Sequence, residues 1–429
     1  MDDDDEVIVV GGGLAGLVAA RRLADAGANV RLFERESEVG GRVRSRHEDG
    51  YTFDRGFQVL FTAYPAARRE LDLDALDLRS FSPGACICRP GHRAILSDPF
   101  RDPGSLTESL LNRDVTVGDK LRTFRLQRAL GRRSTDDLFS GPDRTIRDYL
   151  GARGFSRKFV ENFAAPFYGG ITLDRSLSTS KRVFEYTFKM LSEGKTVVPA
   201  GGMGAIPAQL RDRAEAAGAV VETDRTVERV DGGGAGDSGL PGVDLAGETL
   251  TADAVVVAAD PKHANELTGV NAIPTAARAC VTQWYALSGG TGFDAGRRIM
   301  LNAADEGPNQ VVDHTAVAPE YVPDGVRLLS ATYLGEREDE SDADLASTTV
   351  ETLESWYPER RFDDVDLRRT DRIPFAQFDQ PPGFSEALPD VRAPDGAVYL
   401  AGDYTRWSSI QGAMESGRDA AEAVRTDLD

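Results

Sequence analysis

A glycine-rich turn directly after a short apolar strand constrains the fold of this 429-residue chain more than any other feature. Glu6–Val10 has the β-branched composition of a buried parallel strand, and the pattern that follows residue 14 predicts a helix. Between them lies Gly11-Gly-Gly13-Leu-Ala-Gly16, which matches G-x-G-x-x-G. In that motif Gly11 permits the tight turn, Gly13 lets a pyrophosphate approach the backbone, and Gly16 lets helix and strand pack closely. The helix N-terminus then faces the phosphates, so this segment predicts a nucleotide site.

The residue that ends the second strand supports a nucleotide site. Asn29–Phe33 is the expected second strand, and Glu34 follows it at the usual distance from the glycine turn. A carboxylate in this place can accept hydrogen bonds from a ribose diol, and it repels a 2′-phosphate. These features do not separate FAD from NAD.

The α/β alternation recurs in three separate stretches of the chain. We therefore expect an α/β protein with a Rossmann-like nucleotide domain that is discontinuous in sequence, built from residues 1–65, 195–268 and 393–429. The insertions 66–194 and 269–392 are expected to form a mixed α+β substrate domain. In the first insertion the periodicity is helical from 66 to 192, with amphipathic helices predicted over 114–130 and 144–168.

Two further motifs carry a family resemblance. Residues 34–42, ERESEVGGR, with Phe53-Asp54-Arg55-Gly56, resemble the extended fingerprint of the flavin amine oxidase and phytoene desaturase superfamily. Residues 398–405, VYLAGDYT, and 411–417, QGAMESG, resemble its C-terminal flavin signature, and 199–203, PAGGM, is similar to its motif before a second helix. The resemblance covers mainly the three stretches of the nucleotide domain and implies FAD as the cofactor.

The resemblance also implies roles for individual residues. Arg42 would pair with the pyrophosphate, Asp403 would accept hydrogen bonds from the ribityl chain, and the backbone of Val227 would contact the adenine. Backbone N–H groups at 411–413 would face the pyrimidine edge of the flavin, where negative charge develops on reduction. The residues expected to bind FAD are Gly11, Gly13, Leu14, Ala15, Gly16, Glu34, Arg35, Gly41, Arg42, Gly56, Phe57, Gln58, Val227, Gly402, Asp403, Gln411, Gly412 and Ala413.

The C-terminal signature looks closest to that of carotenoid desaturases. This implies an FAD-dependent oxidoreductase that takes a hydride from an apolar substrate, a polyene or another isoprenoid, onto flavin N5. The electron acceptor would be oxygen, a quinone or another oxidant, and such enzymes usually work at a membrane surface. No catalytic side chain is assigned.

Three alternatives to a desaturase remain open. The first is a flavin amine oxidase or a protoporphyrinogen-oxidase-like enzyme. Amine oxidases commonly place a lysine near flavin N5, and neither Lys195 nor Lys262 matches that motif position. The second is an isomerase that uses reduced flavin without net redox turnover. The third is a nicotinamide-dependent dehydrogenase without flavin, against which the C-terminal signature argues.

The composition bears on location and partners. The 50 Lys+Arg stand against 70 Asp+Glu, a net charge of −20, and only six of the basic residues are lysines. This balance indicates adaptation to a salt-rich cytoplasm, the alternative being an ordinary acidic protein with high-GC codon usage. It argues against nucleic acid as a partner, and against an anionic membrane bound through a basic face.

The few cysteines and histidines argue against a disulfide framework and against a metal site. The three cysteines and four histidines form neither a disulfide framework nor a metal-ligand spacing, so no metal is expected. The chain also has no apolar run of the roughly 20 residues that span a bilayer. An acidic start precedes the apolar stretch 7–20, unlike the positive start of a secretory signal. We therefore expect a cytoplasmic protein with, at most, peripheral contact with a membrane surface.

Overall fold

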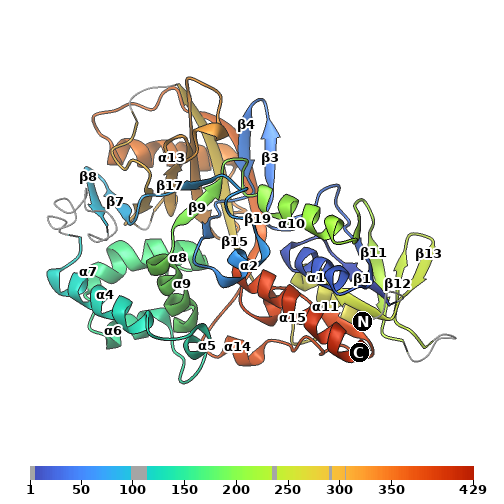
Figure 1. Cartoon of the computed structure of the whole chain (residues 1–429). Coiled ribbons are helices and arrows are strands. Elements are labelled where there is room, and N and C mark those ends of the chain that lie inside the picture. Colours follow the sequence, from blue (N-terminus) through green and yellow to red (C-terminus); the bar gives the residue numbers. More distant parts are fainter. Residues whose placement is uncertain (1–4, 98–113, 234–238, 289–291, 305) are drawn as a thin grey trace.

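The computed structural model describes residues 5–97, 114–233, 239–288, 292–304 and 306–429 (Figure 1). Five parallel strands, in the order β10-β2-β1-β14-β20, form the sheet on which the glycine turn lies. Strands far apart in sequence are thus neighbours in space, and β14 and β20 follow β1 at one side of the sheet. Their bounds are β1 Glu6–Val10, β2 Asn29–Phe33, β10 Val220–Glu222, β14 Ala254–Val257 and β20 Val398–Leu400.

Both faces of this parallel sheet are covered. Val7 and Val9 belong to the hydrophobic cluster that includes the helices α1, α10 and α15, whereas Ile8 and Val10 belong to a second cluster with β11, β12 and α11. A strand buried on both faces is apolar throughout, as the sequence of β1 is. The predicted Rossmann-like fold is therefore confirmed. The covering elements are α1 Leu14–Asp25, α10 Ala205–Ala216, α15 Ile410–Leu428, β11 Val227–Asp231, β12 Gly242–Leu245, β13 Glu248–Thr251 and α11 Pro261–Thr268.

A seven-stranded mixed sheet, in the order β19-β15-β18-β17-β16-β7-β8, forms the other large layer. Helix α13 (Asp342–Trp356) covers part of it, and Leu353 and Trp356 of the helix are buried in one hydrophobic cluster with side chains of the sheet. Figure 1 shows this sheet and its helix beside the group of helices α4 to α9. The strands are β7 Ala85–Arg89, β8 His92–Leu96, β15 Ala277–Ser288, β16 Ile299–Asn302, β17 Gln310–Asp313, β18 Val326–Leu334 and β19 Asp366–Phe378.

Smaller elements connect these layers. Strands β3 and β4 form a hairpin, and β5-β9-β6 form a short sheet. The strands are β3 Ser45–Glu48, β4 Tyr51–Asp54, β5 Leu60–Phe61, β6 Leu78–Ser80 and β9 Thr196–Pro199. The remaining helices are α2 Pro65–Glu70, α4 Val117–Leu130, α5 Thr135–Leu138, α6 Ile146–Ala152, α7 Arg157–Phe159, the π-helix η2 Val160–Ala164, α8 Ala165–Thr172, α9 Lys181–Glu193, α12 His314–Val317, α14 Phe384–Ala387, and the 3-10 helices η3 Pro319–Tyr321 and η4 Asp403–Thr405.

Two predictions for the first insertion are wrong. The single helix expected over 144–168 is broken, because Gly154 has a φ of +77° and Ser156 caps a new helix by accepting a hydrogen bond from the Phe159 N–H. The helical pattern expected from 66 onward is interrupted by β6, β7 and β8. The last two strands pair around Pro90-Gly91, a turn dipeptide that predicts a hairpin.

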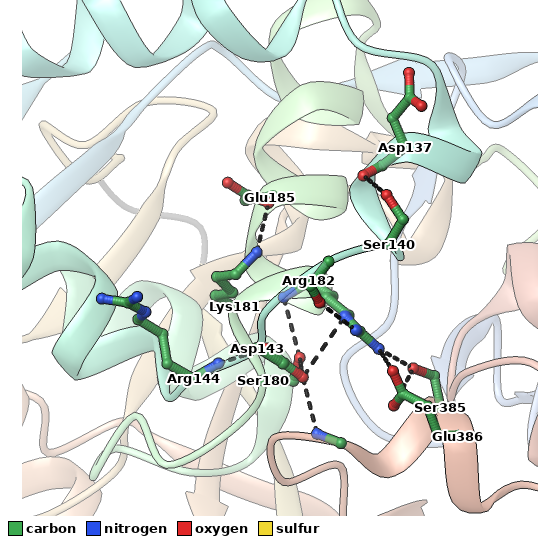
Figure 2. Close-up of polar contacts among 12 residues, drawn as sticks. Asp137, Ser140, Asp143, Arg144, Ser180, Lys181, Arg182, Glu185, Ser385 and Glu386 are labelled. Carbon is green, nitrogen blue, oxygen red and sulfur yellow. Dashed lines mark hydrogen bonds and ion pairs between the residues drawn. The ribbon is translucent and has the colours of Figure 1, made fainter.

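A buried arginine fastens the helical group to the segment that follows β19 (Figure 2). Arg182, at the start of α9, is 3% exposed, and its NH1 lies 2.6 Å from Glu386 Oε1. Nearby, Asp143 Oδ2 accepts hydrogen bonds from Ser180 Oγ (2.7 Å) and from the Gly383 N–H (2.9 Å). The two insertions are therefore joined by charged and hydrogen-bonded contacts here.

The division into two domains stays a prediction. Two observations on the composition of the sheets bear on it. All five parallel strands fall within 1–65, 195–268 and 393–429. The seven-stranded sheet combines β7 and β8, from the first insertion, with five strands of the second.

Candidate functional site

A large cavity of about 1780 Å³ runs between the two major sheets. At one end it is lined by Gly13 and Glu34, at the carboxyl ends of β1 and β2, where ligands bind in open parallel sheets. At the other end it reaches β16, β17 and the helices α4 and α8. Pockets for one small molecule typically measure about 300–1,000 Å³, so this volume has room for a cofactor and a second molecule together.

The three glycines of the turn differ in what surrounds them. A Cβ on Gly11, whose φ is +108°, would lie 2.7 Å from Ala258 O, and one on Gly16 would lie 2.0 Å from Gly11 O. A Cβ on Gly13 would meet nothing within 4 Å, and Gly13 lines the cavity. Gly11 and Gly16 therefore serve the packing of the turn, whereas Gly13 leaves open space where a pyrophosphate fits.

Glu34 is held in place by backbone N–H groups. Its carboxylate is buried, with Oε2 accepting from the Gly12 N–H (2.7 Å) and Oε1 from the Glu36 N–H (2.9 Å). Both bonds fix the carboxylate at the end of β2, on the cavity wall. It is positioned to accept hydrogen bonds from a ribose diol, the role we expect for it.

Arg42 and Asp403 meet on the cavity wall. Arg42 NH2 lies 2.6 Å from Asp403 Oδ1, and Ser408 Oγ donates to Oδ2 at 2.8 Å. Asp403 is 3% exposed, and Oδ1 receives no aligned hydrogen bond from the described residues. Arg42 and Ser408 therefore fix the Asp403 carboxylate at the cavity wall, and its contact with a ribityl chain stays a prediction.

Most of the residues expected to bind FAD line the cavity, and three do not: Gly16, Gln411 and Gly412. Gln411 Oε1 accepts from the Ala66 N–H (2.8 Å), and the Gly412 N–H donates to Ser409 Oγ (2.8 Å).

Two of the three amides expected to face the flavin are engaged within the helix. The Gly412 N–H donates to Ser409 Oγ and the Ala413 N–H to Ser409 O, so the expected flavin contact stays a prediction and rests mainly on the Gln411 N–H. Ser409 and Ile410 line the cavity, although neither is among the residues predicted to bind FAD. A serine directly before a helix is the usual N-cap signal, so Ser409 could have been found.

Asp54 belongs to the 53–56 motif, from which no role for its side chain was predicted. Its Oδ1 accepts from Ser45 Oγ (2.5 Å) and from the Met203 N–H (2.8 Å), and its Oδ2 accepts from the Tyr321 hydroxyl (3.1 Å). Asp54 therefore ties the 53–56 motif to the 199–203 motif. Complete burial of the carboxyl group raises its pKa from 3.8 to about 6.

An Asp54→Asn substitution should change how stability depends on pH. Because the folded state binds this proton more tightly than the unfolded state, wild-type stability falls as pH rises from about 4 to about 6. A pKa of about 6 in place of 3.8 corresponds to about 3 kcal/mol. Relative to wild type, the variant should therefore gain up to about 3 kcal/mol between pH 4 and pH 7.5 in urea unfolding. Asp339→Asn, an exposed carboxyl, is the control. A stability difference that is the same at both pH values would contradict this assignment.

Aromatic side chains dominate the far limb of the cavity. Phe159, Phe163 and Phe167 are spaced four residues apart, with successive ring centroids 5.4 Å and 5.1 Å apart, and all three line the wall. Phe57 and Phe81 line it as well, with their centroids 6.1 Å apart. The limb therefore presents a mainly apolar surface next to the expected flavin position.

The described residues give no sign of a membrane span or a metal site. None of their helices combines the length and hydropathy needed to cross a bilayer. In the same part of the chain, no three His, Cys, Asp or Glu side chains come together as metal ligands. Lys195 lines the cavity, as does Lys120, whereas Lys262 does not.

Comparison with known proteins identifies the family. The family model described as flavin containing amine oxidoreductase matches residues 14–425. A zeta-carotene-forming phytoene desaturase of Myxococcus xanthus is 29% identical over 290 residues, and a carotenoid 3,4-desaturase of Haloarcula japonica is 28% identical over 286. Each alignment covers 59% of this chain and 53% or 55% of the relative, so the match spans about half the length of these proteins.

A solved structure shares the fold over its whole length. An oxidoreductase from Methanosarcina mazei superimposes with a TM-score of 0.74 at 18% identity, covering 97% of this chain and 100% of that one. Together with a family match that spans most of the sequence, these findings show that the chain belongs to the flavin containing amine oxidoreductases, FAD-dependent oxidoreductases.

Proposed function

We propose that this enzyme oxidises a long apolar substrate, a polyene or another isoprenoid, by hydride transfer to FAD. The observation that carries the proposal is the continuity of the cavity, which joins the nucleotide-binding turn at Gly13 to the aromatic limb at Phe163 and Phe167. The two carotenoid desaturases among the relatives support the substrate class.

The residues of the chain have positioning roles in this proposal. Bound FAD would supply the hydride acceptor at N5. Glu34, Arg42 and Asp403 would hold it by its ribose, its pyrophosphate and its ribityl chain. Phe57 and Phe163 would orient the apolar chain of the substrate and exclude water from the reacting carbon. No side chain is needed as a strong acid or base.

The test is an anaerobic visible spectrum of the protein purified in concentrated potassium chloride. We expect a yellow protein that is bleached by pooled polyenes and unaffected by pooled amines. Bleaching by amines alone would replace this proposal with amine oxidation, for which Lys195 on the cavity wall would then be the first residue to substitute. Activity with polyenes only after chemical reduction would point to a non-redox isomerase. A protein that stays colourless when FAD is supplied would overturn the FAD assignment.

We also propose that helix α4 rests on the membrane that holds the substrate. Val117, Leu121 and Phe124 are 80%, 49% and 44% exposed and lie three or four residues apart, on one side of the helix. Arg125 and Arg128 are exposed on the same helix. These arginines give helix α4 a local positive charge, although the net charge of the whole chain is −20.

The position of α4 suits delivery of a lipid-soluble molecule. Phe124 lines the cavity, so the exposed apolar side of the helix adjoins the aromatic limb. A lipid-dissolved substrate could then enter without crossing water. Oxygen, a quinone or another oxidant would serve as electron acceptor, and a quinone would be supplied by the same membrane.

Serine at Val117, Leu121 and Phe124 together should weaken membrane binding at least tenfold. Burying such side chains contributes about 1.5–3 kcal/mol each, whereas molar salt leaves a Debye length of only about 3 Å and removes most of the arginine contribution. The measurement is co-flotation with vesicles of phosphatidylglycerol and phosphatidylcholine in concentrated potassium chloride. Val220→Ser, an exposed valine on β10, is the matched control. Equal flotation of wild type and triple variant would refute the contact.

A further inference from the structure

One polar side chain in the apolar limb has a free hydrogen-bond donor. Gln310, the first residue of β17, is 6% exposed and lines the cavity. Several of its neighbours on the wall are apolar: Leu301 is its pairing partner on β16, and Gly170 and Ile171 come from α8. Unlike the amide of Gln377, which donates to Ile171 O, that of Gln310 has no protein acceptor among the described residues, and such a group fixes the orientation of a ligand.

Neighbouring contacts determine which way this amide is turned. Arg175 NH1 donates to Asn309 Oδ1 (3.3 Å), which identifies that atom as the oxygen. Asn309 Nδ2 therefore faces the other way, where it donates to Pro166 O (2.9 Å) and to Gln310 Oε1. Because Gln310 Oε1 accepts this hydrogen bond, it faces Asn309, and the amide nitrogen of Gln310 must point away from Asn309.

Close packing keeps the amide pair in this arrangement. A Cβ on Gly170 would lie 2.7 Å from Asn309 Nδ2 and 3.1 Å from Gln310 Oε1, so only glycine lets α8 approach β17 this closely. Gln310 Nε2 has no acceptor among the described residues, and it is not one of the polar atoms sealed from solvent. Its two N–H groups therefore border the cavity.

We infer that Gln310 Nε2 donates a hydrogen bond to an oxygen atom of the substrate, which is accordingly a hydroxylated or carbonyl-bearing isoprenoid rather than a plain hydrocarbon. This inference rests on the proposed function. A hydrocarbon in the same place would displace water from the Gln310 N–H groups without offering an acceptor. Leaving a neutral amide donor unpaired in this way lowers the affinity about ten- to a hundredfold. The preference for an oxygen-bearing substrate over a hydrocarbon therefore comes mainly from the cost of leaving the Gln310 donor unpaired, and less from the hydrogen bond gained with the substrate oxygen.

The test compares a linear polyene with its monohydroxylated counterpart in the flavin-loaded enzyme. Dissociation constants from the absorption shift of the polyene and rates of anaerobic flavin reduction are measured for both. Wild type should prefer the hydroxylated compound at least tenfold in both measurements. Gln310→Leu should lose this preference through weaker binding of the hydroxylated compound, while the hydrocarbon binds as well as before or better.

Two further variants separate a specific effect from a general one. Gln310→Met keeps the approximate size of the side chain and has no N–H or O–H donor, so it should also lose the preference, and it tests the inference should the leucine variant not fold. Gln127→Leu removes an amide from another part of the cavity wall and should leave the preference intact.

The outcomes distinguish the inference from the function on which it rests. If neither polyene binds or reduces the flavin, the proposed substrate class fails, and the inference fails with it. If both polyenes react with equal constants in wild type, or if Gln310→Leu keeps the wild-type preference, the substrate class stands and only the inference is overturned.

Discussion

Asp403→Ala should purify with little or no flavin, and its dissociation constant for added FAD should rise about ten- to a hundredfold. The carboxylate is 3% exposed and lies on the cavity wall, where Arg42 and Ser408 hold it in place. A hydrogen bond from a ligand hydroxyl to an ionised group contributes about 1.5–3 kcal/mol. The alanine variant also leaves Arg42 without its ion-pair partner. The measurement is the ratio of visible to ultraviolet absorbance after purification, followed by FAD titration.

The control for this variant removes an ion pair that lies off the cavity. Asp419 is on α15, pairs with Arg406 through a 2.7 Å contact to Nε, and does not line the wall. Asp419→Ala should therefore retain flavin, even if it lowers stability as much as Asp403→Ala does. Should Asp403→Ala not fold, Asp403→Asn keeps the size of the side chain and serves in its place. Full retention of flavin in a folded Asp403 variant would remove this residue from the assigned site.

The parallel sheet could be predicted from sequence because its signals are local. Strand β1, the glycine turn and helix α1 are contiguous, and Gly11 and Gly16 each have a φ or a backbone contact that only glycine tolerates. The same holds for Glu34, whose place after β2 follows from the length of a βαβ unit. Residues whose positions follow from the βαβ unit could therefore be predicted from the sequence.

Apart from Ser409, whose N-cap signal is local, the residues missed include ones whose role depends on long-range contacts. Asp54 acquires its function from Met203 and Tyr321, which are far away in the sequence. Gln310 looks like any polar residue at the start of a strand until Asn309 and α8 fix its amide. The Pro90-Gly91 turn is a local signal for the β7–β8 hairpin, but the pairing of β7 with β16, which places the hairpin in the seven-stranded sheet, depends on a contact far away in the sequence.

Gly13→Ala and Gly16→Ala should fail in different ways, although both remove a glycine of the same turn. Gly16→Ala places a methyl group 2.0 Å from Gly11 O and 3.1 Å from the Ala258 side chain, so the helix must move away from the strand. Overpacking of this kind costs about 1–3 kcal/mol or more. We expect the melting temperature of the FAD-free protein to fall by several degrees, and flavin to be lost as a consequence.

Gly13→Ala should leave the FAD-free protein as stable as wild type and still weaken FAD binding at least tenfold. Gly13 has a φ of −72° and a ψ of 176°, which any L-residue adopts, and its added methyl group meets nothing within 4 Å. The methyl group projects into the cavity, where it would occupy the space that a pyrophosphate needs. Melting curves without FAD and titrations with it separate the two variants. Normal FAD affinity in Gly13→Ala would show that the pyrophosphate does not pass over this turn, because no loss of stability would be available to explain the result.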